Sequence, residues 1–394
     1  MGYAFEVDET VRAAVHRITD EQVERAIAAL EQVSGTGRGP DLDEAVHDCR
    51  KRTKKLRGLI RLVRPALGAA FGPANESFRD AARELSGLRD AGAALVTFDA
   101  LVAASPDLLP EGGLGAVRSG LAREAEATTA TGDGNRDSDG KRDRDGNRDS
   151  DGNSHRHSDR HGPARFESAV ALLRAGRRHV ARAQLDADGW AALGPGAERT
   201  YRAGRRALAD ARRRPEPAAM HEWRKRTKDA WYHVRLLRPA APSVLGPLED
   251  RFHDLSDALG DVHDLVVITE HLRAAPDRFG GEAQVRAACE LADARRAELE
   301  RRAVSLGARH YAEKPGRYAD RLGAYWRVWH ESGAEETAGG LADLFPPSDG
   351  LDDLDLDALR DRAGEAALPA HPYPSKDRLV GELRAAGHVM GGTG

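Results

Sequence analysis

Two copies of one basic pattern contain the residues of this chain whose types and spacing point most clearly to chemistry. Both copies read His-x-x-Arg-Lys-Arg-Thr-Lys. The first begins at His47 and the second at His221, 174 positions later. The correspondence continues without a gap as far as Asp90 and Asp264. An ungapped match of this length predicts that the chain consists of two homologous halves.

Each copy has the periodicity of an amphipathic helix. At about 100° per residue, the basic side chains fall on one face and the apolar side chains fall on the other. The basic faces carry Arg50, Lys51, Lys54, Arg57 and Arg61 after His47 in the first copy, and Arg224, Lys225, Lys228 and Arg235 after His221 in the second. At 1.5 Å per residue, each cationic row is roughly 20 Å long.

These rows lack the acidic residues that a merely solvated face would contain. Between Arg50 and Arg64 there are eight Lys and Arg residues and no carboxylate. Like charges three or four residues apart repel each other and destabilise a helix, and an ordinary soluble surface mixes both signs of charge. The pattern therefore favours a polyanion site, whose ligand cancels the repulsion, over the alternative of an ordinary basic surface.

The composition limits the class of protein. The chain has 394 residues, of which 31% are charged and only 5% are aromatic, and its formal net charge is −4. This length suits two domains or a repeat pair, and the abundance of Ala, Arg, Leu and Glu predicts an all-α fold. Cys49 and Cys289 are isolated, so neither a disulfide framework nor a metal cluster is indicated, and no cofactor is expected. No apolar run reaches the length of a membrane span and the first residues do not form a signal peptide, so we expect a cytoplasmic protein.

The apolar periodicity predicts where the helices lie. In the first half we expect helices over residues 11–33, about 41–65, 72 to about 104, from about 115, and 165–185. In the second half we expect helices from about residue 197, around the second basic copy, and over 248–273, 282–306 and 314–330. The aromatic stripe of the last of these helices is interpreted as core. We accordingly divide the chain into residues 1–190, 195–332 and 341–394.

Two further segments differ from this pattern. Residues 131–162 contain mainly Gly, Asp, Asn, Arg, Ser and His and lack large apolar side chains, so a disordered insert is predicted at about 130–163. Its Asp-x-Asp-Gly units resemble calcium loops, but no Glu closes a twelve-residue loop, and no calcium is expected. Residues 341–394 are acidic and are predicted to form a small helical extension or a partly ordered tail. One interpretation of this acidity is that the tail competes with a ligand for the basic rows of its own chain.

The repeated motif resembles the conserved histidine α-helical domain, abbreviated CHAD. Further segments that look like this family are 200–206, 221–228, 259–264 and 311–315. The resemblance covers roughly residues 3–330, excluding the insert. It implies two four-helix bundles related by pseudo-twofold symmetry, with basic helix faces around a central groove or pore. It also implies binding of inorganic polyphosphate without catalysis, and association with polyphosphate granules.

The expected polyphosphate site combines three groups of residues. The motif itself carries over His47, Arg50, Lys51, Lys54, Arg57, His221, Arg224, Lys225 and Lys228. Arg61 and Arg235 are added because they lie on the same helix faces. Arg205 and Lys314 are added because they lie in matching family segments. In the second copy Trp231 stands opposite Arg57, so this position is not cationic in both halves.

Two other functions compete with polyphosphate binding. A metal-dependent phosphohydrolase is suggested by His253-Asp254 and His263-Asp264, but the first half has Arg79 and Arg89 opposite the two histidines, and arginine does not ligate metals. We therefore expect neither an enzyme nor a metal site. Nucleic-acid binding is the stronger alternative, because contacts to phosphate alone do not distinguish the two polyanions. The scarcity of aromatic residues on the basic faces favours polyphosphate.

His47 and His221 have two interpretations. A bound polyanion would favour their protonated forms, and binding would then strengthen on mild acidification. Alternatively, each histidine forms a hydrogen bond to a neighbouring helix.

Overall fold

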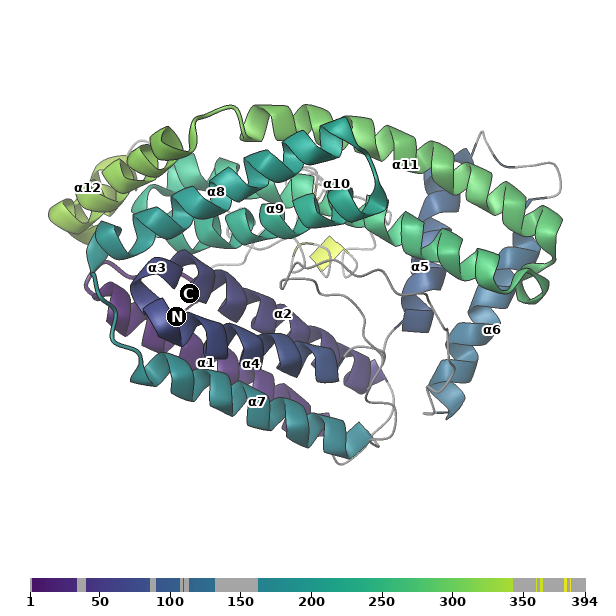
Figure 1. Cartoon of the computed structure of the whole chain (residues 1–394), viewed down its shortest axis with the longest axis horizontal. Coiled ribbons are helices and arrows are strands. Elements are labelled where there is room, and N and C mark those ends of the chain that lie inside the picture. Colours follow the sequence, from purple (N-terminus) through teal and green to yellow (C-terminus); the bar gives the residue numbers. More distant parts are fainter. Residues whose placement is uncertain are drawn as a thin grey trace.

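The computed structural model describes residues 2–33, 40–85, 90–106, 109, 113–131 and 162–342, together with residues 359, 362, 363, 379, 380 and 383. All elements within these ranges are helices, which confirms the predicted all-α fold (Figure 1). In chain order the α-helices are Val11–Val33 (α1), Pro40–Leu62 (α2), Arg64–Leu67 (α3), Phe71–Glu84 (α4), Asp90–Ala104 (α5), Gly115–Thr131 (α6), Gly162–Arg182 (α7), Gly189–Arg213 (α8), Pro217–Leu237 (α9), Pro242–Ala274 (α10), Glu282–His310 (α11) and Pro315–Ala342 (α12). Short 3-10 turns lie at Gly68–Ala70 (η1), Arg238–Ala240 (η3) and Pro276–Phe279 (η4).

Most helices begin and end where the sequence predicts. α1 has the expected bounds, and its apolar stripe is buried. Proline is the first residue of α9, α10 and α12, where its missing N–H leaves no helical hydrogen bond unmade and its fixed φ suits the first turn. After α10 and η4, Gly280 adopts the left-handed conformation at φ 89° and lets the chain turn into α11.

The helices pack in two groups that share one hydrophobic core. α1, α2, α4 and α7 contact one another, and α8, α9, α10 and α11 form a second series of contacts that α12 extends (Figure 1). α2 also contacts α8 and α9, so the two groups meet through the basic helices. One cluster of buried side chains runs through both groups, from Phe5 near the N-terminus to Trp329 in α12.

The expected third helix of the first half is wrong. Instead of one helix from residue 72 to about 104, the structure has α4 and α5 on either side of residues 86–89. α4 already ends at Glu84, with Leu85 as its C-cap, before this interval begins. After the second basic copy, by contrast, one continuous helix, α10, spans Pro242–Ala274.

α5 and α6 pack against helices that follow the second basic copy in the sequence. Both helices contact α11, α5 contacts α10, and α6 contacts η4 (Figure 1). The Glu124 carboxylate of α6 lies 2.6 Å from His271 Nε2 and 2.9 Å from Arg278 Nη1. Gly120 permits this close approach, since a Cβ atom there would lie 2.5 Å from the carbonyl oxygen of Arg278. α5 and α6 thus complete the packing of α10 and α11.

The aromatic stripe of α12 belongs to the core, as predicted. Tyr318, Trp326 and Trp329 are buried. The Tyr318 ring stacks on Tyr201 of α8 with 4.0 Å between centroids, and Trp326 meets Phe5 edge to face at 5.3 Å. These contacts fix α12 across the second group of helices.

Several predictions lie outside the described residues. The insert falls between the end of α6 and the start of α7, and most of the C-terminal extension also lies outside. In that extension Leu359, Ala363, Leu379, Val380 and Leu383 form a small buried cluster of their own. None of the helices in the described ranges combines the length and the apolar character needed to cross a membrane. The division into three domains stays a prediction.

Gly196 of α8 gives a direct test of how the two helix groups meet. A Cβ atom at this position would lie 1.7 Å from the carbonyl oxygen of Leu62, at the end of α2. Because a backbone atom cannot move aside cheaply, we expect Gly196→Ala to destabilise the protein by roughly 1–3 kcal/mol or more, as overpacking does. Thermal or urea unfolding measures this loss.

Gly316 of α12 provides the matched control. It is also helical, but the nearest atom to a Cβ there would be Oε1 of Glu198 at 3.9 Å, an ordinary contact. Gly316→Ala should therefore be neutral or stabilise by up to about 1 kcal/mol, since alanine favours the helix. Equal losses for the two variants would contradict the close contact at Gly196.

Candidate functional site

The two basic helices touch at equivalent positions of the repeat. A Cβ atom at Gly58 of α2 would lie 2.8 Å from Cβ of Tyr232 on α9, and these two residues correspond at the spacing of 174. Beside this contact, Nε2 of buried His233 lies 3.1 Å from the carbonyl oxygen of Gly58. The Tyr3 hydroxyl donates to the carbonyl oxygen of Lys55 at 2.8 Å, and its ring lies 6.0 Å from that of Tyr232. The structure thus brings the two helices that carry the cationic rows into direct contact.

One carboxylate joins cations from both helices. Asp229 of α9 is buried, and its Oδ1 accepts a hydrogen bond from Nη1 of Arg61 on α2 at 2.8 Å. Its Oδ2 lies 3.3 Å from Nη1 of Arg226. A paired carboxylate at this depth offsets the repulsion between neighbouring guanidinium groups. Arg61 therefore links α2 to α9, and its expected contact with a ligand stays a prediction.

The third cation of each motif is held in the same way in both halves. Arg52 Nε lies 2.6 Å from Asp48 on α2, and Arg226 Nε lies 2.7 Å from Glu222 on α9. Both are pairs between residues four apart, with the acidic residue on the N-terminal side, the favourable order for a helix. Lys225 also approaches Glu222, at 2.8 Å.

The remaining predicted site residues differ in exposure and surroundings. His47, Lys54 and Lys314 are exposed; the half-buried ones are Arg50, Lys51, Arg57, Arg205, His221, Arg224, Lys225, Lys228 and Arg235. Arg57 Nε donates to Asn75 of α4 at 3.2 Å. Arg235 lies 3.7 Å from Glu249 of α10 and 5.9 Å from the Trp231 ring centre.

Arg205 and Lys314 lie at the junction of α8 with the α11–α12 turn. The Arg205 guanidinium donates to the carbonyl oxygen of Glu313, and the neighbouring Tyr201 hydroxyl donates to the carbonyl oxygen of His310 at 2.9 Å. Glu313 in turn pairs with Arg321 of α12 at 2.8 Å. Arg205 thus holds this turn in place, and its expected role towards a ligand stays a prediction.

Helix α10 supplies side chains along α9 that the sequence did not assign to the site. The ring centroids of His221 and His263 lie 4.6 Å apart, and those of Trp231 and His253 lie 4.5 Å apart. Between these pairs, a Cβ atom at Gly260 would lie 3.5 Å from Nε of Arg224. Along α9 these contacts follow the order His221, Arg224 and Trp231. Their partners on α10 have descending numbers at the same spacing, namely His263, Gly260 and His253. The two helices are therefore antiparallel neighbours in constant register, and this register could not be predicted without knowing how they pack.

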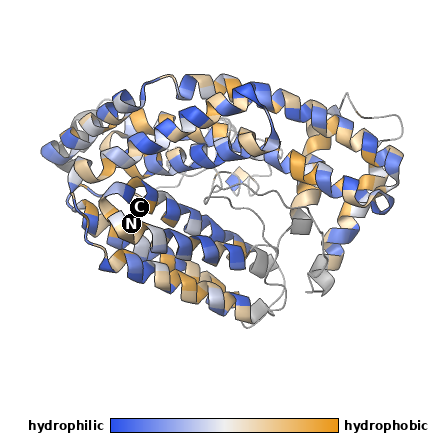
Figure 2. Cartoon of the chain, in the orientation of Figure 1, coloured by the Kyte–Doolittle hydropathy of each residue, from blue (hydrophilic) through white to orange (hydrophobic). Residues whose placement is uncertain are grey.

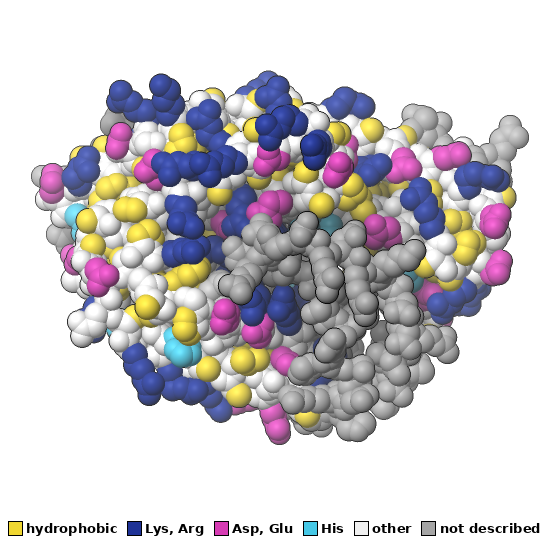
Figure 3. All heavy atoms as spheres, in the orientation of Figure 1, with side chains coloured by type: hydrophobic (Ala, Val, Ile, Leu, Met, Phe, Trp, Pro, Cys, Tyr) yellow, Lys and Arg dark blue, Asp and Glu magenta, His cyan; other side chains and the backbone are white. Residues whose placement is uncertain are grey.

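The charge distribution agrees with this arrangement. Figure 2 shows α2 and α9 as hydrophilic over much of their length, whereas α5 is mostly hydrophobic. On the face of the molecule that Figure 3 displays, Lys and Arg side chains gather along the upper edge and near the middle, with acidic side chains among them.

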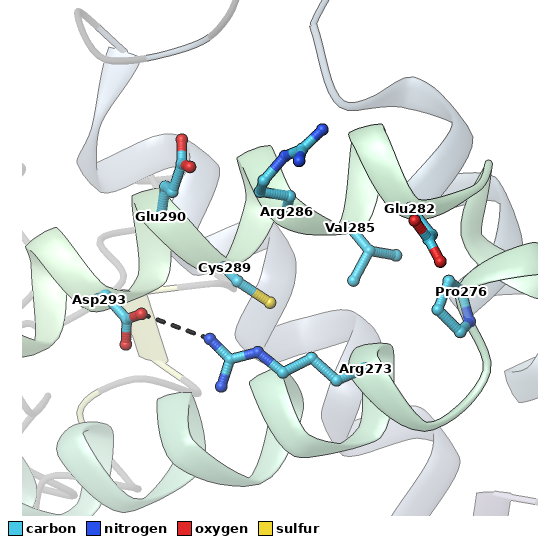
Figure 4. Close-up of a pocket in the computed structure, with 8 residues that line it drawn as sticks. All are labelled: Arg273, Pro276, Glu282, Val285, Arg286, Cys289, Glu290 and Asp293. Carbon is cyan, nitrogen blue, oxygen red and sulfur yellow. Dashed lines mark hydrogen bonds and ion pairs between the residues drawn. The ribbon is translucent and has the colours of Figure 1, made fainter.

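Within the described residues, the cavity between α10 and α11 is lined by residues outside the cationic rows of α2 and α9. The described part of the chain contains no group of three or more His, Cys, Asp or Glu side chains placed to hold a metal ion. A cavity of about 410 Å³ lies between α10 and α11 (Figure 4). Arg273 and Asp293, 3.5 Å apart, line it beside Cys289. Burial raises the pKa of the Cys289 thiol, which disfavours the reactive thiolate.

The structure therefore defines an all-helical protein in which two basic helices from corresponding parts of the sequence pack together. The sequence profile of the CHAD domain matches residues 17–273, about two thirds of the chain. The protein belongs to the CHAD domain family, as the repeated motif predicted. No curated protein matches the chain.

The lowered pKa of His233 predicts that acid destabilises the contact between α2 and α9. Burial lowers the pKa of His233 to about 4, whereas the unfolded chain takes up this proton near pH 6.5. The stability that depends on neutral His233 is therefore complete above about pH 6.5 and is lost progressively as the pH falls towards 4, by at most about 3 kcal/mol. Free energies of unfolding between these pH values measure the loss.

His233→Gln separates this contribution from those of other groups. Glutamine does not titrate, and its amide N–H is able to donate to the Gly58 carbonyl oxygen in place of the imidazole. The variant should lose less stability than the wild type between pH 6.5 and 4. Identical pH dependence in both proteins would show that His233 is not the group responsible.

Proposed function

We propose that this protein binds inorganic polyphosphate, without catalysis, along the cationic rows of α2 and α9. The observation that supports this most directly is the contact between the two basic helices, which belong to a chain of the CHAD domain family. The binding residues in this proposal are those expected from the motif, led by Arg50 and Lys54 on α2 and Arg224 and Lys228 on α9.

The proposed mechanism is electrostatic. Guanidinium and ammonium groups donate charge-assisted hydrogen bonds to phosphoryl oxygens along a linear chain. Binding neutralises the mutual repulsion within each row, and it releases counterions from the polyanion. Affinity should therefore fall steeply as the salt concentration rises.

The aromatic side chains near the rows favour polyphosphate over nucleic acid. Tyr232 is buried and packs against Tyr3 and Trp231. Trp231 is half-buried and meets His253 edge to face. Rings that are occupied in this way offer little area on which an unpaired base could stack. Nucleic-acid binding through phosphate alone is the second candidate, because it would use the same cations.

We also propose that the two helix groups are the pseudo-twofold halves implied by the repeat. At a twofold axis a residue meets its own equivalent, and Gly58 contacts Tyr232, its counterpart 174 positions later. The acid–base pairs Asp48–Arg52 and Glu222–Arg226 also occupy equivalent positions. On this arrangement both rows would face one shared groove, and localisation would follow that of the ligand, in the cytoplasm and on polyphosphate granules.

Competition binding at fixed salt tests the choice of ligand. Long-chain polyphosphate is compared with single-stranded and duplex DNA of equal phosphate content, on the full chain. We expect polyphosphate to bind about tenfold or more tightly, a difference of ~1.4 kcal/mol or more. The variant Arg50→Glu/Arg224→Glu should abolish this binding, because it places a carboxylate in each row.

A charge-matched control distinguishes the site from general electrostatics. Arg206→Glu/Arg301→Glu changes the net charge by the same amount at exposed positions of α8 and α11, and it should bind nearly as well as the wild type. Equal losses in both variants, or DNA that binds as tightly as polyphosphate, would reject the proposed site.

A further inference from the structure

The two cationic rows carry unequal charge. Residues 47–65, which contain the first copy of the motif, include eight Lys and Arg residues and one acidic residue. The corresponding residues 221–239 include six Lys and Arg residues and two acidic residues. With histidine neutral, the formal charges of the two segments are +7 and +4. Two exchanges account for the difference, because Asp229 and Trp231 stand where the first copy has a lysine and an arginine.

The helix beside each row adds to this inequality. Asn75 of α4 and Glu249 of α10 occupy corresponding positions, 174 residues apart, and are buried to the same extent, with 9% and 8% of their surface exposed. Nε of Arg57 donates to Oδ1 of Asn75 at 3.2 Å. A neutral amide does not offset the charge of a guanidinium group. The buried neighbour of the α2 row is therefore neutral, whereas that of the α9 row is a carboxylate.

Glu249 lies against two cations at the end of the α9 row. Its Oε1 is 3.7 Å from Nε of Arg235, and its Oε2 is 3.8 Å from Nη1 of Arg238, the first residue of η3. The arginine side chains are 21% and 38% exposed, but that of Glu249 is only 10% exposed. Because a buried charge is screened less than an exposed one, Glu249 offsets the attraction that both guanidinium groups exert on an anion in solution.

The other acidic contacts of the two basic helices do not distinguish the rows. Asp229 accepts a hydrogen bond from Arg61 of α2 and also approaches Arg226 of α9, so it pairs with one cation of each row. Asp48 and Glu222 pair with corresponding arginines of the motif. The inequality is therefore concentrated where Arg57 meets an amide on α2, and where the α9 row has Trp231 and Glu249 instead.

We propose that the two rows bind polyphosphate unequally, with α2 as the tighter subsite and Glu249 as the residue that weakens the α9 row. This inference rests on the proposed function and assigns a different role to each row. At Arg57 a phosphoryl oxygen replaces or joins a neutral amide, whereas at Arg235 and Arg238 it competes with a carboxylate. A polyphosphate chain that covers a single row, roughly 20 Å long at 1.5 Å per residue, therefore occupies α2 first, and a longer chain engages both rows.

Reciprocal substitutions in the full chain test this inference. Glu249→Gln gives the α9 row a neutral neighbour, and Asn75→Asp gives the α2 row a carboxylate 3.2 Å from Arg57 or closer to it. Both changes nearly conserve side-chain size. At fixed pH and salt, we expect Glu249→Gln to raise the affinity for long-chain polyphosphate about threefold or more and Asn75→Asp to lower it about tenfold. An unchanged or lower affinity for Glu249→Gln would overturn the inference.

The salt dependence of binding separates this role from a purely structural one. The slope of log affinity against log salt concentration reflects the number of phosphates that the protein neutralises, at about 0.7 for each contact with a single-stranded polyanion. Glu249→Gln should steepen the slope, because Arg235 and Arg238 engage the ligand more fully, and Asn75→Asp should make it shallower. A variant that only disturbs packing changes the affinity without steepening the slope, so an unchanged slope for Glu249→Gln would also contradict the inference.

Glu124→Gln provides the matched control. The Glu124 side chain is 13% exposed and pairs with an arginine and a histidine, but it lies on α6, outside both rows. The substitution removes the same charge from a similarly buried carboxylate, and it should leave the affinity and the salt slope close to those of the wild type. An increase equal to that of Glu249→Gln would show that general charge explains the effect, and the inference would be rejected.

A comparison of the two rows leaves Glu249 in place. Arg50→Glu and Arg224→Glu reverse a charge at the same motif position, one in each row. Arg50→Glu should lower the affinity about tenfold more than Arg224→Glu does. Equal losses would overturn the inference, even if Glu249→Gln failed to fold. Absence of polyphosphate binding by the wild type would instead reject the proposed function itself.

Discussion

The packing of two like-charged helices is the constraint on which the rest of this structure depends. α2 and α9 each carry a cationic row that weakens its own helix, and the fold nevertheless presses the two together at Gly58 and Tyr232. Two features make this approach feasible. Glycine removes the side chain at the contact, and Asp229 places a buried carboxylate between cations of both helices. The hydrophobic core on the far side of each helix supplies the stability that the rows lack.

The two basic copies are alike within the motif but differ in the helices beside them. Each copy has an acid–base pair between residues four apart, Asp48–Arg52 on α2 and Glu222–Arg226 on α9. Beside the rows, α4 places the neutral Asn75 next to Arg57, whereas α10 places Glu249 next to Arg235. Two copies of one motif therefore need not form two copies of one site, because residues outside the motif determine which groups lie against each row.

The sequence was sufficient to predict most of the helices, because helix formation depends on local periodicity. The bounds of α1, the buried stripe of α12 and family membership were all predicted correctly. The single third helix of the first half was not, because α4 ends at Glu84 and α5 begins only at Asp90. The bond between Arg61 and Asp229 and the contact of His221 with His263 were also missed. Each joins residues that are distant in sequence, and only the packing register decides which of many polar residues meet.

The position of α5 and α6 has a consequence for how the chain reaches its native state. These helices belong to the first half by sequence, but their contacts are with α10, α11 and η4 of the second. α10 and α11 therefore lack part of their packing until α5 and α6 arrive. Contacts such as that between Glu124 and His271 span nearly 150 residues, and long-range contacts of this kind slow folding because loop closure must precede them. A chain cut between the two basic copies would therefore yield two fragments that depend on each other for these contacts.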